Sequence, residues 1–187
     1  FSNRQASVYD PATGTFELID TCFATHHLQF DNDPDSTVYF NELLGPILGW
    51  VNTREFDRTH DEQATQGWCP QIVDSNGDGK ITKPWNKAGG PVDPKLDTEV
   101  RYNLYAIIPS PVDNSVWGAS EDYPGYIIRI DRGNNPPETC ATEVYKVPAP
   151  GIDPRGIDID SNGIVWTALA ASSHLASFDR SKCKVLN

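Results

Sequence analysis

Methionine and long apolar runs are both missing from this sequence of 187 residues. The longest uncharged apolar stretch, 163–178, is interrupted by Ser172, Ser173 and His174 and falls short of the about 20 apolar residues that a membrane helix needs. We therefore expect no membrane span. The chain begins at Phe1 without a basic and apolar leader, so we expect a processed or incomplete chain from which any signal peptide has been removed.

Basic residues are scarce in this sequence. The 15 Lys and Arg stand against 26 Asp and Glu, which gives a formal net charge of −11. Binding to nucleic acid or to an anionic membrane surface needs clustered Lys and Arg, so the composition argues against both kinds of partner. An acidic surface of this kind suits cations instead.

Closely spaced cysteines are also absent. The chain has Cys22, Cys69, Cys140 and Cys183, and no pair has the Cys-x-x-C spacing of zinc or thioredoxin-like sites. Two interpretations stay open: buried free thiols, or disulfides formed in an oxidising compartment, which the even number and the turn-rich composition favour. Spacing alone does not give the pairing, and Cys183 could pair with a residue beyond position 187. We expect a secreted or periplasmic protein.

Turn-forming residues are abundant, and they punctuate a repeat. The 14 Gly and 15 Pro are scattered along the chain, which favours short strands over long helices. A unit of strand, turn and strand occurs three times, at 25–40, 105–117 and 154–166. The aromatic residues at the end of the second strand in each unit are Phe40, Trp117 and Trp166.

Further strands are expected after each unit. The third strands are predicted at 47–52, 126–131 and 174–179, and fourth strands with period-2 alternation at 15–19 and 142–147. Corresponding residues of successive units are about 48 positions apart, a period typical of repeat architectures. A β-sandwich would also contain many short strands, but it does not explain the repeat.

The repeat predicts an all-β fold, a β-propeller of four-stranded antiparallel blades. Residues 1–187 would form three to four blades of a single propeller domain. Closed propellers usually have about four to eight blades. Because an open array leaves sheet edges and blade faces uncovered, we expect missing blades of the same protein or a protein partner to cover them.

The blades resemble those of streptogramin lyase (virginiamycin B lyase) and NHL-type propellers. The resemblance rests on Tyr9–Phe16, which reads Y-D-P-A-T-G-T-F, and on the strand-turn-strand segments Thr25–Glu42 and Pro154–Trp166. It covers most of the chain outside 53–104. Since such blades occur in enzymes, scaffolds and sensors, the resemblance implies the fold more strongly than an activity.

An insertion at 53–100 lengthens one blade and contains a calcium-loop motif. Residues 74–81 read D-S-N-G-D-G-K-I, the first eight positions of such a loop. In a calcium loop, oxygens at positions 1, 3, 5 and 7 surround one hard cation. The predicted calcium ligands are therefore Asp74, Asn76, Asp78 and the Lys80 carbonyl. Position 12 is Trp85 where an EF-hand has Glu, so water or a later acid such as Asp93 or Asp97 would complete the site. A turn without metal is the alternative.

Candidate chemical groups lie where the inner strands begin. His26 and His27 occupy the position that Arg155 and Gly156 take in the later unit, so His26, His27 and Arg155 are the predicted binding residues. Glu42 resembles a glutamate of the lyase family, and His26 with Glu42 is the candidate acid–base pair. Histidine and arginine at repeat positions also commonly bond neighbouring blades, which would make these residues structural.

Two functions follow as hypotheses. The first is an extracytoplasmic β-propeller that acts as a calcium-stabilised binding or structural module. The alternative, implied by the resemblance, is a metal-assisted lyase or hydrolase of the streptogramin lyase type with its active site at the channel mouth. An enzyme would bring a histidine and a carboxylate from different blades together in one cavity there.

Overall fold

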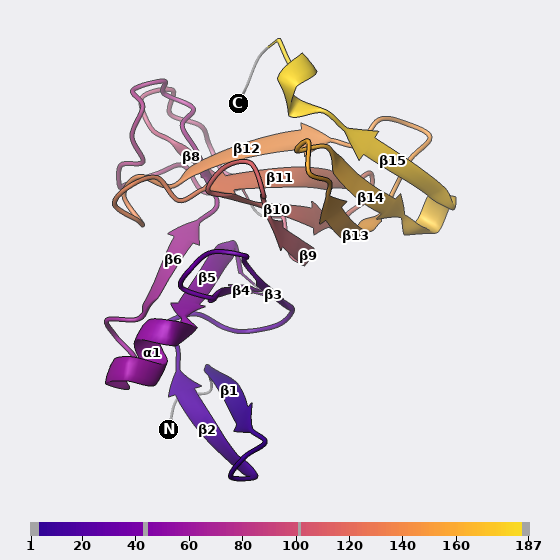
Figure 1. Cartoon of the computed structure of the whole chain (residues 1–187). Coiled ribbons are helices and arrows are strands. Elements are labelled where there is room, and N and C mark those ends of the chain that lie inside the picture. The colour runs from indigo at the N-terminus through magenta and orange to yellow at the C-terminus, as the bar shows by residue number, and fades with distance from the viewer. Residues whose placement is uncertain (1–3, 43–44, 101, 185–187) are drawn as a thin grey trace.

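The computed structural model describes residues 4–42, 45–100 and 102–184, which form mainly short antiparallel strands (Figure 1). Three sheets dominate, and each follows chain order. The first has β3 (Leu28–Phe30), β4 (Thr37–Asn41), β5 (Ile47–Asn52) and β6 (Gln66–Pro70). The second has β9 (Leu104–Pro109), β10 (Ser115–Ser120), β11 (Tyr126–Asp131) and β12 (Ala141–Lys146). The third has β13 (Pro154–Ile159), β14 (Val165–Leu169) and β15 (His174–Phe178).

Smaller elements lie before and between these sheets. The hairpin of β1 (Gln5–Asp10) and β2 (Thr15–Asp20) precedes the first sheet. The segment 53–100 contains α1 (Thr53–Thr59), the outer strand β6, and the short pair β7 (Ile72–Val73) and β8 (Thr98–Glu99). Two 3-10 turns, η1 (Ala170–Ser172) and η2 (Arg180–Lys182), flank β15. Within the part of the chain that is described, no helix has the length and apolarity to cross a membrane.

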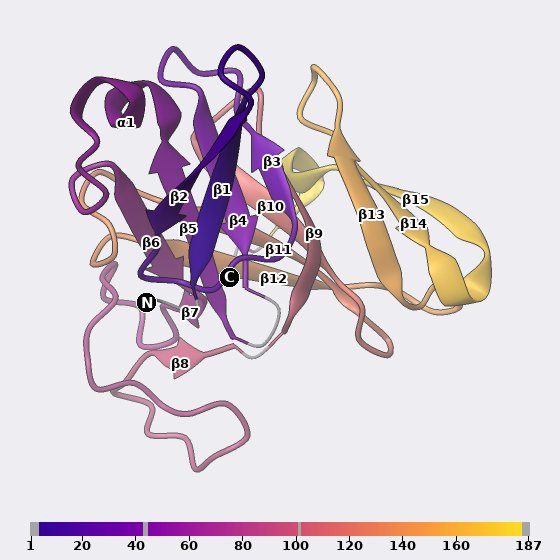
Figure 2. The same ribbon diagram turned by 90° about the horizontal axis from the view of Figure 1, so that it is seen from below.

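The three sheets are arranged as propeller blades. The first strand of the second sheet, β9, contacts β3 and β4 of the first sheet and β13 of the third. In Figure 2 the strand β9 accordingly lies between β3 and β13. Sheets that meet through their first strands and diverge toward their last ones have the geometry of blades around an axis. The predicted all-β fold of antiparallel propeller blades is confirmed.

Aspartate side chains fix the tight turns between neighbouring strands. Asp10 accepts the Ala12 amide and the Thr13 hydroxyl, and Gly14 closes the β1–β2 turn with φ of +70°. In the third sheet Asp160 accepts the amides of Asn162 and Ile164. These are the Asx-type turns that the Asp and Asn residues between period-2 segments predict.

The strand register confirms one predicted equivalence and corrects another. Trp117 pairs with Arg129, two residues before Asp131, and Trp166 pairs with Ser177, two residues before Asp179, so the two Trp residues are equivalent in successive sheets. In the first sheet the same position, opposite Trp50 and two residues before Asn52, is taken by Tyr39. The prediction of Phe40 was wrong by one residue, because two aromatic residues are adjacent in β4 and only the pairing with β5 decides between them.

Alternation along the strands places a hydrophobic core between each pair of sheets. Tyr39, Leu48 and Trp50 of the first sheet pack with Leu104, Ile107 and Ile128 of the second. On the opposite face of β4, Val38 and Phe40 pack with Ile19 of β2. The second and third sheets share a core built from Trp117, Ile127, Val147, Val165 and Leu169.

One disulfide joins the outer margins of the first two blades. Cys69 of β6 and Cys140, which precedes β12, are 71 residues apart in sequence and form a disulfide between the two sheets. Cys22 and Cys183 are free thiols, the former exposed and the latter half-buried. The disulfide interpretation is therefore confirmed for one pair, whereas neither free thiol is buried as the other interpretation required.

The two terminal sheets leave apolar side chains exposed. Trp117 is only 3% exposed, whereas its equivalent Trp166 in the last sheet is 40% exposed. At the other end Phe16 and Leu18 of β2 face outward, as expected for an uncovered blade. Ile157 and Ile159 of the last sheet, in contrast, pack against the core shared by the second and third sheets. Each terminal sheet thus has one covered and one open face.

Candidate functional site

The beginnings of the inner strands bring three equivalent side chains together. His26, Tyr105 and Arg155 each lie two residues before an inner-strand isoleucine or leucine that pairs with the second strand of its own sheet. The His26 and Tyr105 rings are 6.2 Å apart, and the Arg155 guanidinium carbon lies 5.3 Å from the centre of the Tyr105 ring. One residue from each of three blades therefore reaches the same place.

A buried amide holds the histidine pair against the second blade. Asn41 is fully buried, and its Oδ1 accepts the His27 amide at 2.7 Å. Its Nδ2 donates across the blade boundary to the carbonyls of Leu104 and Tyr105. The hydrogen bonds of the Asn41 side chain thus hold the start of β3 beside β9.

The same contacts bear on the protonation of the two histidines. His27 Nδ1 contacts the Tyr105 carbonyl, which only accepts, so this nitrogen is protonated. Asn41 Nδ2 also lies 3.3 Å from His26 Nδ1. Desolvation, with a smaller contribution from the charge of His27, lowers the pKa of His26, while Glu121 partly opposes this. His26 is consequently neutral at pH 7.

Two carboxylates position the arginine. Arg155 Nε lies 3.2 Å from an oxygen of Asp153, which is buried, and Nη2 lies 3.7 Å from Glu121. The charge of Asp153 and its hydrogen bond raise the pKa of Arg155. Tyr105, Asn41, Asp153 and Glu121 escaped the sequence analysis. Tyr105 was detectable, because the third copy of the repeat places it in the column of His26 and Arg155.

Glu42, the predicted acid–base partner of His26, has a different environment. Its Oε1 accepts the Ala24 amide at 3.2 Å, and the carboxylate lies so close to Gly45 that a Cβ there would be 1.9 Å from Oε2. The carboxylate whose charge acts on His26 is Glu121, at the end of β10 in the next blade. The structure thus brings His26, His27 and Arg155 together, whereas the Glu42 carboxylate lies between the Ala24 amide and Gly45.

A groove of about 410 Å³ between β1 and β3 borders His26. Its walls are mainly apolar and include Val8, Leu28 and Phe40. Polar groups at the end of such a groove can orient a molecule whose apolar part the groove accommodates.

The side-chain oxygens of the loop 74–80 accept hydrogen bonds from the loop's own backbone amides. Asp74 accepts the amides of Gly77 and Gly79 at 2.8 Å, and Asp78 Oδ1 accepts the Lys80 amide. Among the residues described, no group of three or more His, Cys, Asp or Glu side chains is arranged to hold a metal. Nearby, Asp97 is buried with Oδ2 on the Thr82 amide and Oδ1 without a hydrogen-bond partner. An orphaned buried carboxylate oxygen beside this loop fits a hard cation.

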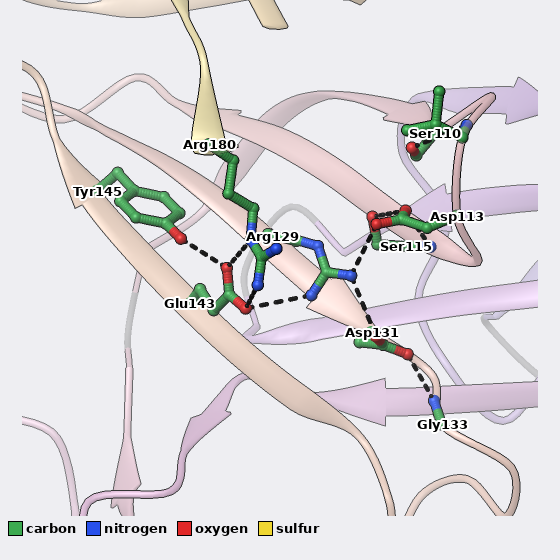
Figure 3. Close-up of polar contacts among 10 residues, drawn as sticks. Ser110, Asp113, Ser115, Arg129, Asp131, Gly133, Glu143, Tyr145 and Arg180 are labelled. Carbon is green, nitrogen blue, oxygen red and sulfur yellow. Dashed lines mark hydrogen bonds and ion pairs between the residues drawn. The ribbon is translucent and has the colours of Figure 1, made fainter. Parts of the chain in front are cut away.

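A second charged cluster joins the outer parts of the second and third blades (Figure 3). Arg129, 7% exposed, donates to Asp113, Asp131 and Glu143, and Glu143 also accepts two bonds of 2.6 Å from Arg180. Burial alone would raise the pKa of Asp113, but hydrogen bonds from Ser115 and Arg129 outweigh it and lower the pKa to about 2. The bonds from Arg180 to Glu143 connect the third blade to the second, while Arg129 Nε is buried without a hydrogen-bond partner.

Two solved structures are similar to this chain. The virginiamycin B lyase from Staphylococcus aureus is 14% identical over 94% of this chain, with a TM-score of 0.42. A streptogramin B lyase structure is 16% identical over the same share, with a TM-score of 0.39. The chain spans 62% of the length of each of them. Neither a protein-family model nor a curated protein matches the chain.

Proposed function

We propose that this chain is the binding part of an extracytoplasmic β-propeller, with its ligand site at the beginnings of β3, β9 and β13. The observation that carries the proposal is the convergence of His26, Tyr105 and Arg155 from three blades. The neutral imidazole of His26 borders an apolar groove, and the guanidinium of Arg155, held by Asp153, lies against the neighbouring Tyr105 ring. The ligand would be a small molecule with one polar and one apolar end.

A thermal-shift screen of small polar molecules tests the binding site. A ligand of this site should raise the melting temperature of the wild type and should lose that effect in His26→Ala and in Arg155→Ala. His174→Ala is the matched control, because His174 is an exposed histidine on β15. The proposal fails if no compound has an effect that depends on both His26 and Arg155.

We also propose that calcium stabilises the inserted loop through Asp74, Asn76, Asp78 and the Lys80 carbonyl. The order of these residues and the orphaned Oδ1 of buried Asp97 support this assignment. Millimolar calcium should raise the melting temperature of the wild type. It should not change the melting temperatures of Asp74→Asn and Asp97→Asn. Asp35→Asn, in another acidic turn, should keep the full response. A calcium response that survives in Asp74→Asn would contradict the assignment.

Two features support an extracytoplasmic location and a partner for the open faces. The Cys69–Cys140 disulfide is of the kind that persists in oxidising compartments. Phe16 of β2 and Trp166 of β14 are exposed on the two terminal sheets. Further blades or a partner protein would cover these apolar side chains.

The competing function is a metal-assisted lyase or hydrolase of the streptogramin lyase type. The lowered pKa of His26 favours it, because a neutral imidazole can accept a proton. Incubation with a cyclic depsipeptide ester and magnesium, followed by liquid chromatography and tandem mass spectrometry that separate a ring-opened isomer from the cyclic ester, tests this function. Elimination opens the ring with no change in mass, hydrolysis adds one water, and an unchanged cyclic ester rules the function out.

A further inference from the structure

One cavity lies at the outer rim, away from the inner strands. Its volume is about 530 Å³, within the range of about 300 to 1,000 Å³ of small-molecule sites. Three segments line it: Trp68 and Pro70 of β6, the insertion residues 80–83 and 85, and 137–139 before β12. In Figure 1 the inserted loops and the β11–β12 connection lie at the same end of the molecule.

The walls of this rim cavity are tied to one another. Cys69, between Trp68 and Pro70, forms the disulfide with Cys140, which directly follows Thr139. The third wall is held by the Thr82 amide, which donates to buried Asp97 at 2.9 Å. Walls fixed in this way lose little conformational entropy when a ligand binds.

The lining combines indole rings with ammonium groups. Lys83 Nζ lies 5.1 Å from the centre of the Trp85 ring, and Lys87 Nζ lies 5.9 Å from it. Lys87 is bound to Glu99 at 2.7 Å, whereas in the described part of the chain Lys80 and Lys83 have no carboxylate within ion-pair distance. The segment 80–95 contains four of the 15 basic residues and a single acid, in a chain of net charge −11.

We propose that the rim cavity binds an organic anion that carries an apolar ring. The ring would pack against Trp68 and Trp85, and the anionic group would accept hydrogen bonds from Lys80 and Lys83. The lining also includes Glu138, so two ammonium groups stand against one carboxylate, and this excess of positive charge selects the anion over an organic cation of the same shape. Nothing in this site is shared with His26, Tyr105 or Arg155.

A titration with 1-naphthoate, followed through the indole N–H signals in ¹H–¹⁵N spectra, tests the proposal. The signals are assigned with single Trp→Phe variants. Naphthoate should shift the signals of Trp68 and Trp85 and leave that of Trp166 in place, although Trp166 is exposed. The isosteric cation 1-naphthylmethylammonium should bind at least tenfold more weakly. Lys83→Gln combined with Lys80→Gln should weaken naphthoate binding about tenfold, the loss expected for a charge-assisted contact.

A control variant at another exposed lysine separates loss of binding from a general effect of removing a surface charge. Lys182→Gln, an exposed lysine on the opposite part of the chain, should leave naphthoate binding unchanged. The proposal is overturned if naphthoate at millimolar concentration leaves Trp68 and Trp85 unshifted, if the cation binds equally well, or if the double Lys variant binds like the wild type.

Discussion

At the scale of single residues, a few buried polar side chains determine how the blades meet. Asn41 connects the first blade to the carbonyls of the second, and Arg129 collects three carboxylates at the boundary with the third. A buried polar group is costly to leave without a partner, so removal of either residue affects the whole contact.

Replacement of Asn41 should therefore destabilise the protein. Asn41→Ala leaves the His27 amide and the Leu104 carbonyl without partners, and we expect the free energy of unfolding to fall by about 2 kcal/mol. Urea denaturation measures this change. Asn162→Ala, in an exposed turn, is the control and should change stability by less than about 0.5 kcal/mol. Equal stability of the two variants would show that the Asn41 bonds are not important.

The carboxylates around Arg129 should make stability dependent on acid. The pKa of Asp113 is about 2 in the folded protein and 3.8 in the absence of partners, so its ionised form is stabilised by folding. This contribution is present above about pH 4 and is lost as the pH falls toward 2. Urea midpoints measured from pH 7 to pH 2.5 should decline less in Asp113→Asn than in the wild type. Parallel declines would contradict this assignment.

At the scale of elements, the outer strands are joined by covalent and ionic bonds while the inner strands pack directly. The Cys69–Cys140 disulfide closes a loop of 71 residues. In the chain-entropy model a cross-link of this length stabilises the folded state by about 4 kcal/mol.

Loss of the disulfide should accordingly be much more harmful than loss of the free thiols. Cys69→Ala with Cys140→Ala should lower the free energy of unfolding by about 4 kcal/mol, and reduction of the wild type should have the same effect. Cys22→Ser with Cys183→Ser serves as the control and should leave the urea midpoint unchanged under oxidising conditions. If the control variant is destabilised as strongly, the pairing described here is incorrect.

The sequence predicted the strands and much of the site, and its failures have physical causes. Period-2 alternation and turns rich in Asp and Asn predicted the strands around Trp117 and Trp166, and the repeat placed His26 and Arg155 in one column. Tyr39 was missed because register depends on pairing with β5, and Glu121 because it reaches His26 from another blade. The Cys69–Cys140 pairing also depends on the distance between sheets, which spacing in the chain does not encode.

At the scale of the whole molecule, the open faces should govern association. Phe16 is 70% exposed and Leu175 is 71% exposed, on opposite terminal sheets. Burial of each such side chain contributes about 1.5 to 3 kcal/mol. Residues 1–187 expressed alone should therefore self-associate, and Phe16→Ser with Leu175→Ser should shift the population toward monomer in light-scattering measurements. A wild-type monomer that unfolds cooperatively would refute the prediction.

The two blade boundaries differ in what could pull them apart. Between the first and second blades, Asn41 joins the inner strands and the Cys69–Cys140 bond joins the outer ones, so these two sheets can separate only if a covalent bond breaks. Between the second and third blades the outer attachment is ionic, through Arg129, Glu143 and Arg180. Under mechanical load or in acid, the third sheet should detach first, as a single unit, and leave the first two blades together as a resistant core.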